Sequence, residues 1–117
     1  MAYLAQLIDD VVANKFQLDK PKVTIGRRPD CTIQINDVAV SGEHAVISLE
    51  KSTYLEGSVD IFIEDLGSTN GSFVNGNPVQ GKIRLTNDDV VRFAWNEFKL
   101  MGADSDDLEG TALILGL

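Results

Sequence analysis

Three short motifs place hydrogen-bond donors next to glycine. They are Thr24-Ile25-Gly26-Arg27, then Ser41-Gly42-Glu43-His44, and then residues 65–76, which contain Ser68-Thr69-Asn70-Gly71. A guanidinium is a planar fork that gives a phosphate two parallel charge-assisted hydrogen bonds, and small hydroxyls add further donors. Arg27 follows an apolar run that would end a strand, so its side chain can reach over a loop surface. These residue types suit the binding of a phosphate group, whereas Arg27 taken alone would be interpreted as an exposed surface arginine.

The sequence lacks the patterns that catalysis or metal binding would require. His44 is the only histidine and Cys31 the only cysteine, so no typical set of zinc ligands can be assembled. There is no Gly-x-Ser-x-Gly segment and no evident partner for His44, which argues against a hydrolase triad. We therefore expect no metal site and no catalytic residues.

Between the motifs, apolar and polar residues alternate in many short segments. The alternating apolar residues are Phe16/Leu18, Val23/Ile25, Ile33/Ile35, Ala45/Ile47/Leu49, Ile61/Ile63, Val91/Phe93/Trp95 and Phe98/Leu100. A period of two is typical of strands with one buried face, and turn-forming residues such as Arg28-Pro29-Asp30 and Asn75-Gly76 separate the segments. Many short strands with regularly spaced turns predict an all-β sandwich or barrel.

The first segment of the chain, residues 2–13, fits two patterns. Alternation of Tyr3, Ala5 and Leu7 fits a strand. The spacing of Leu4, Leu7, Ile8 and Val11 would instead fit one face of a helix. Because the downstream pattern is all strand, we expect an edge strand here.

Length and composition favour one domain followed by a short tail. A chain of 117 residues with 44% hydrophobic content can form a single packed core. We expect residues 1–103 to form this domain and residues 104–117 to form an acidic linker and an apolar C-terminal tail. The tail either packs back on the domain or acts as a docking segment, and a homodimer formed through it is a further alternative.

The charge and the single cysteine restrict the partners and the compartment. A net charge of −8 argues against nucleic acid and against an anionic membrane surface as partners. No apolar run is long enough to span a membrane, no signal-peptide pattern is visible, and one cysteine excludes an internal disulfide. We expect a cytoplasmic location.

The ordered set of motifs, from about Val23 to Leu100, closely resembles the forkhead-associated (FHA) domain. This resemblance implies a β-sandwich of two antiparallel sheets with about eleven strands and binding loops at one end. It also implies that the protein binds phosphothreonine peptides and is not an enzyme. Because the family binds its ligands at loops and not in a cleft, the resemblance implies no cofactor. By resemblance, Arg27 binds the phosphate, Ser41 donates to it, Thr69 lines the pocket, and Asn70 hydrogen-bonds the peptide backbone.

Other motif residues support the site by resemblance, and two depart from the family pattern. His44 holds the serine loop in shape, while Gly26 and Gly71 give close backbone approach. Gly42 stands where the family often has Asn, Arg or Lys, so it offers a phosphate only its backbone N–H. Glu43 stands where a basic residue is frequent, so an acid is expected beside the site.

The resulting hypothesis is a non-catalytic adaptor that recognises a threonine-phosphorylated protein downstream of a Ser/Thr kinase. Gly42, Glu43 and the charge of −8 motivate an alternative on the same fold. In that alternative the domain binds a partner or itself without phosphate, through a sheet face or the apolar tail. The two hypotheses differ in whether Arg27 is needed for binding.

Overall fold

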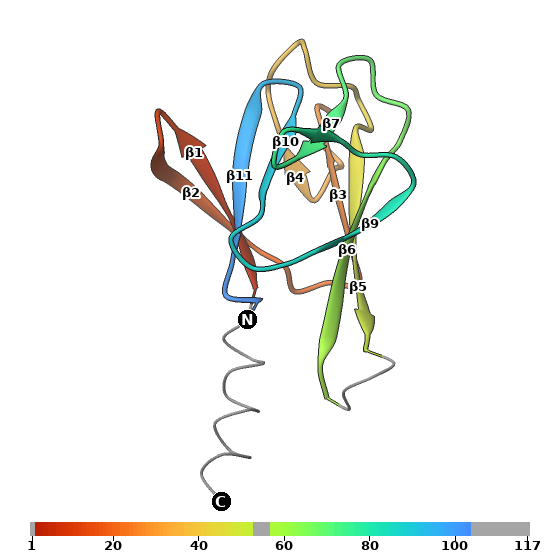
Figure 1. The fold of residues 1–117 in the computed structure, drawn as a ribbon. Helices are drawn as coiled ribbons and strands as arrows, with labels where there is room; N and C mark the ends of the chain where they lie inside the picture. Colours follow the sequence, from red (N-terminus) through yellow and green to blue (C-terminus); the bar gives the residue numbers. More distant parts are fainter. Residues whose placement is uncertain (1, 53–56, 104–117) are drawn as a thin grey trace, which may run out of the picture.

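A computed structural model describes residues 2–52 and 57–103, and within them eleven strands form two facing sheets (Figure 1). The strands are β1 (Tyr3–Ile8), β2 (Val11–Gln17), β3 (Lys22–Gly26), β4 (Ile33–Gln34), β5 (Ala45–Lys51), β6 (Val59–Asp65), β7 (Ser72–Val74), β8 (Asn77–Pro78), β9 (Lys82–Leu85), β10 (Val90–Phe93) and β11 (Asn96–Met101). The predicted all-β sandwich of about eleven strands is confirmed.

The two sheets have different strand orders. One sheet is ordered β2-β1-β11-β10-β7-β8, and the other is ordered β4-β3-β5-β6-β9. All pairs are antiparallel except β3 with β4, where Ile25 aligns with Ile33. The expected two antiparallel sheets are therefore confirmed apart from this one parallel pair. Residues 27–32 connect the two strands, and β4 then runs in the same direction as β3.

The core lies between the sheets and is built from the alternating residues. Leu4, Phe93 and Phe98 come from the first sheet, and Ile47 and Ile63 from the second; all five side chains are fully buried. The rings of Phe93 and Phe98 are 5.7 Å apart between centroids. Burial of each such side chain is worth about 1.5–3 kcal/mol, so this layer fixes how the two sheets sit against each other.

The N-terminal segment forms a hairpin and not a single edge strand. Strand β1 pairs with both β11 and β2, so β2 is the edge of the sheet. The chain reverses at Asp9 and Asp10, whose φ angles of 52° and 64° are those of a tight hairpin turn. Aspartate tolerates this conformation without glycine, and for that reason the turn was missed. In Figure 1 the hairpin projects away from the sandwich.

Strand β10 ends earlier than the alternation of Val91, Phe93 and Trp95 predicts. It ends at Phe93, and Ala94 adopts a left-handed φ of 55° that starts the turn into β11. Trp95 therefore lies in the turn and is 69% exposed. The prediction that Trp95 continues the strand is wrong, because the turn reverses the chain one residue before it.

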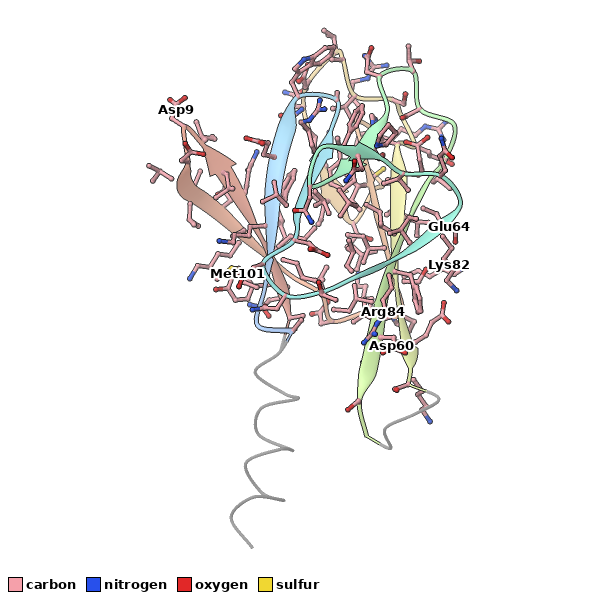
Figure 2. All side chains as sticks on the ribbon, in the orientation of Figure 1. Asp9, Asp60, Glu64, Lys82, Arg84 and Met101 are labelled. Carbon is pink, nitrogen blue, oxygen red and sulfur yellow. The ribbon has the colours of Figure 1, made fainter. Side chains whose placement is uncertain are left out.

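Charged pairs cover the outer edge of the second sheet. Arg84 on β9 contacts Asp60 on β6 at 3.2 Å, and Lys82 pairs with Glu50 on β5 (Figure 2). Charges on an edge strand discourage pairing with another chain. This edge is therefore poorly suited to sheet-to-sheet association.

Three connections gather at one end of the sandwich (Figure 1). They are residues 27–44, the β6–β7 loop of residues 66–71, and the β10–β11 turn. Hydrogen bonds join them: Asn70 Nδ2 donates to Ala39 O, and Ala94 N donates to Gly71 O. All three sequence motifs therefore meet at this loop end.

The expected tail, residues 104–117, lies outside the described residues. Among the residues that are described, no helix has the length and apolar character needed to cross a membrane.

Candidate functional site

Arg27 stands at the point where β3 leaves the sheet. The backbone keeps its pairing for two further residues, with Arg27 N donating to Ser41 O at 3.0 Å and Arg28 N donating to Gly42 O at 3.2 Å. This pairing fixes the first motif beside the second. The Arg27 side chain is exposed, and its Nη1 donates to Val38 O at 3.3 Å, so the guanidinium is held over the loop.

Gly26 is required by a close approach of two backbones. A Cβ atom at this position would lie 2.1 Å from Gly42 O, a distance no side chain can tolerate. Glycine therefore lets the end of β3 and the loop that carries Ser41 come together. Gly71 is favoured for a different reason: its φ of 84° lies in the left-handed region, which glycine adopts without steric cost.

Ser41 links the second motif to the third. Its Oγ accepts a hydrogen bond from Thr69 N at 3.1 Å. A hydroxyl has one hydrogen to donate besides its lone pairs, so the Ser41 O–H stays available to a bound anion. The Asn70 amide is partly committed, because Nδ2 donates to Ala39 O at 2.7 Å. Its carbonyl oxygen and second N–H can still meet a peptide backbone.

His44 is fully buried and joins two of the loops. Its Nδ1 accepts from Ser41 N at 3.1 Å, and its Nε2 lies 2.8 Å from Gly71 O. Because Nδ1 accepts, the ring carries its hydrogen on Nε2 and donates to that carbonyl. The histidine thus fixes the position of Ser41 from behind and does not reach the surface.

Asp65 organises the β6–β7 loop and was not singled out from the sequence. Its carboxylate accepts from Ser68 Oγ at 2.5 Å, Ser72 Oγ at 2.6 Å, Ser68 N at 2.9 Å and Gly67 N at 3.0 Å. Partial burial raises the pKa of this carboxyl, but the hydrogen bonds from Ser68 and Ser72 together outweigh burial and hold the pKa below its usual range. An aspartate followed at +3 and +7 by serines was the available sequence signal.

A cavity of about 310 Å³ lies between these loops. The five residues predicted to contact a phosphopeptide all line it, namely Arg27, Ser41, Gly42, Thr69 and Asn70, and the remaining wall is residues 38–40. Of these described lining residues, Arg27 alone carries a charge. The cavity therefore combines one directed cation with hydroxyl, amide and backbone donors, which is a suitable donor set for a phosphate.

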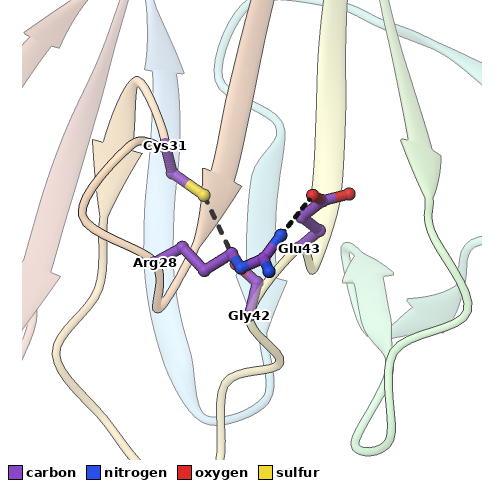
Figure 3. A network of polar contacts seen from close by, with 4 residues as sticks. All are labelled: Arg28, Cys31, Gly42 and Glu43. Carbon is purple, nitrogen blue, oxygen red and sulfur yellow. Dashed lines mark hydrogen bonds and ion pairs between the residues drawn. The ribbon is translucent and has the colours of Figure 1, made fainter.

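The expected acid beside the site is already paired. Glu43 Oε1 accepts from Arg28 Nη1 at 2.8 Å, and both side chains are more than half exposed (Figure 3). Arg28, which the sequence placed in a turn, therefore offsets the charge of Glu43 locally. This pairing joins residues fifteen positions apart and could be found only from the fold.

Cys31 gives the Gly42 carbonyl a second hydrogen bond, besides the one from Arg28 N. Its Sγ donates to Gly42 O at 3.3 Å (Figure 3). Burial and then the charge of Asp30 raise the pKa of the thiol, so it stays protonated and can donate. Among the residues with described positions, no group of three or more His, Cys, Asp or Glu side chains is arranged to hold a metal ion.

The β10–β11 turn also borders the site. Asn96 Nδ2 donates to Asp37 Oδ2 at 3.0 Å, and Asp37 Oδ1 accepts from Ala39 N at 2.9 Å. These bonds, the one from Ala39 first, lower the pKa of Asp37. They also bring exposed Trp95 to the same end as Val38, which is 89% exposed. This contact could not be predicted from the sequence, because Asn96 and Asp37 are 59 positions apart.

Comparisons with known proteins agree with this geometry. A family model described as FHA domain matches residues 23–94. The chain is 35% identical over 94 residues to the glycogen accumulation regulator GarA of Mycolicibacterium smegmatis, covering 80% of this chain and 55% of that protein. It is 36% identical over 76 residues to the oxoglutarate dehydrogenase inhibitor of Corynebacterium glutamicum, covering 65% of this chain and 48% of that protein. The chain thus spans about half the length of these curated relatives.

A solved structure gives the same result at the level of the fold. An FHA domain structure from work on phosphothreonine-dependent FHA domain interactions superposes with a TM-score of 0.70 at 30% identity. The match covers 86% of this chain and 95% of that one. With the family model covering most of the chain and all three motifs meeting at the loop end, the chain belongs to the FHA domain family.

Proposed function

We propose that this chain is a non-catalytic adaptor whose loop end binds a phosphothreonine peptide, with a Ser/Thr kinase acting upstream. The observation that carries the proposal is the cavity in which Arg27, Ser41 and Thr69 meet. The relative of known structure comes from work on phosphothreonine-dependent interactions, which supports the same ligand class. We propose residues 1–103 as the functional unit and a cytoplasmic location.

Each site residue has a separate role in this proposal. Arg27 supplies the directed charge, and Ser41 donates its free O–H to a phosphate oxygen. Thr69 lines the pocket for the threonine, and Asn70 sets the peptide register through its uncommitted amide groups. Gly42 contributes backbone only. Gly26, His44 and Gly71 keep the loops in place behind the cavity.

The curated relatives suggest what the adaptor does after binding. Their names describe a regulator of glycogen accumulation and an inhibitor of oxoglutarate dehydrogenase. We propose by analogy that this chain regulates the protein it binds and performs no chemistry itself. The partner would be a protein phosphorylated on threonine.

Replacing Arg27 tests the proposal. Arg27→Ala should weaken binding of a phosphothreonine peptide about 30-fold or more, because a phosphate would lose its charged partner in a site that excludes part of the water. Arg84→Ala is the matched control, since it removes the same charge. Arg84 lies on β9 and pairs with Asp60 away from the loop end. Fluorescence anisotropy with a labelled phosphopeptide measures both. Equal affinity of wild type and Arg27→Ala for the natural partner would reject the phosphate-binding role.

A further inference from the structure

The cavity holds less positive charge than its proposed ligand requires. A phosphothreonine carries a charge of about −1.5 to −2 at neutral pH, with three acceptor oxygens. Arg27 is the one charged side chain among the described residues that line the cavity. A second cation close to the cavity would help to balance the ligand, and Arg28 lies next to Gly42, which is one of the lining residues.

Arg28 lies across Gly42 on the side where a side chain would leave the backbone. A Cβ atom built on Gly42 would contact Arg28 Cγ at 3.3 Å, Cδ at 3.5 Å and Nε at 3.7 Å. The Arg28 stem therefore occupies the space that a side chain at position 42 would fill. Figure 3 shows the guanidinium passing over Gly42 toward Glu43.

The Gly42 backbone under Arg28 is held firmly. Its carbonyl accepts from Arg28 N at 3.2 Å and from Cys31 Sγ at 3.3 Å. It also lies against Gly26, where no Cβ could fit. The backbone of Arg28 is therefore fixed beside Gly42, and its largely exposed side chain can turn about its own bonds.

Glu43 holds the end of that side chain beside the wall. It takes one of the five N–H donors of the guanidinium, through the 2.8 Å contact with Nη1. The pair is exposed, so it contributes little to stability and can be exchanged for a better partner. A phosphate, with more charge and three oxygens, is such a partner.

We propose that Arg28 is a second phosphate-binding arginine, which reaches over Gly42 from outside the cavity, and that it leaves its ion pair with Glu43 when it binds the ligand. This inference rests on the proposed function of the same site. In this proposal, Arg28 can lie over position 42 because Gly42 has no side chain.

Four proteins test the proposal: wild type, Arg28→Ala, Glu43→Gln, and the double variant. The double variant removes one positive and one negative charge, so its net charge stays at the wild-type −8. Anisotropy titrations with one phosphothreonine peptide and its unphosphorylated form give the affinities. The ¹⁵Nε–H signal of Arg28 in wild type gives a second readout, and thermal unfolding confirms that the exposed positions do not alter folding.

The expected result is a loss of about tenfold in phosphopeptide affinity for Arg28→Ala and for the double variant, since one charge-assisted interaction disappears. Glu43→Gln should bind severalfold more tightly, because the guanidinium no longer has to leave a carboxylate. The Arg28 Nε–H signal should shift on addition of phosphopeptide and stay unmoved with the unphosphorylated peptide.

Two results would overturn the proposal, and they can be told apart. If Arg27→Ala abolishes binding while the charge-matched double variant binds like wild type, Arg28 is only a surface ion-pair partner. If wild type binds the phosphorylated and unphosphorylated peptides equally, the phosphate site itself is absent, and the role of Arg28 falls with it.

Discussion

Asp65 accepts four hydrogen bonds within the β6–β7 loop, so the shape of the loop that carries Thr69 and Asn70 depends on it. Asp65→Asn replaces an acceptor oxygen by a donor that faces other donors. The free energy of unfolding should fall by about 1–3 kcal/mol at neutral pH. Thermal or urea unfolding measures this loss. Asp9→Asn, at the exposed hairpin tip, is the control and should change little (Figure 2).

The same residue makes stability depend on pH. The pKa of Asp65 is lower in the folded chain than its usual value, so folding favours the ionised form. Its contribution is full above the usual aspartate pKa and is lost as the pH falls through the lower, folded-state pKa. Between pH 7 and pH 3 the wild type should therefore lose more stability than Asp65→Asn. If the stability of the two proteins falls equally with pH, the Asp65 carboxylate is not responsible for the pH dependence.

At the level of residues, site residues could be predicted from the sequence where they belong to a short continuous motif. Arg27, Ser41, Thr69 and Asn70 could be named because they belong to three motifs in a fixed order along the chain. Each of these motifs contains a glycine. The partners of Arg28 and Asn96 could not be named, since those contacts join residues that are 15 and 59 positions apart. Side-chain pairing of this kind follows from the fold and leaves no periodic pattern in the sequence.

The junction of β3 with the Ser41 loop depends on two glycines that should respond differently to alanine. Gly26→Ala would place a Cβ 2.1 Å from Gly42 O, so the two backbones must separate, at a cost of about 1–3 kcal/mol or more. Gly42→Ala meets only the flexible stem of Arg28 at 3.3 Å, and Gly42 is not among the glycines with positive φ. It should fold with nearly wild-type stability.

Chemical denaturation of the two variants checks this contrast. Phosphopeptide affinity should fall along with stability in Gly26→Ala, because the pairing that sets Arg27 beside Ser41 is disturbed. Equal stability of both variants would mean that the close approach at Gly26 relaxes without cost, contrary to the geometry.

At the level of elements, alternation predicted most strands, and the errors fall at turns. The hairpin turn at Asp9-Asp10 and the turn at Ala94 both use left-handed residues other than glycine or asparagine. Such turns carry a weak sequence signal, because most residues avoid this conformation and only the surrounding structure enforces it. As a result, the N-terminal hairpin was reduced to one strand and Trp95 was placed in a strand.

For the whole molecule, the net charge of −8 opposes the approach of a phosphopeptide. At about 10 mM salt the screening length is about 30 Å, and at about 150 mM it is about 8 Å, so salt removes the distant repulsion before it weakens the local contacts. The association rate should therefore rise between these two conditions, most strongly for acidic peptides. In complexes with attractive long-range fields the rate falls instead.

Stopped-flow fluorescence can measure this rate through the single tryptophan, Trp95, which is exposed beside the loop end. A neutral dye-labelled peptide of the same length is the control and should show little dependence on salt. An association rate that falls with salt for the phosphopeptide would show that the local potential of Arg27 and Arg28 governs the encounter.

The overall architecture followed from the sequence because two independent patterns agreed: period-two alternation indicated the sheets, and the ordered motifs indicated the loop end. The N-terminal hairpin and the parallel β3–β4 pair did not follow, since strand order is set by packing over long sequence separations. The C-terminal tail and a dimer through it remain predictions, because residues 104–117 lie outside the described part of the chain.

The central claim is that the loop end recognises phosphothreonine, and one titration tests it most directly. Three degenerate peptide pools, carrying phosphothreonine, phosphoserine or unmodified threonine at the fixed position, are compared by fluorescence anisotropy with the whole chain. We expect saturable binding to the phosphothreonine pool, weaker binding to phosphoserine, and none to the unmodified pool. Equal binding to all three pools, or no binding to the phosphothreonine pool at high micromolar protein, would contradict the claim.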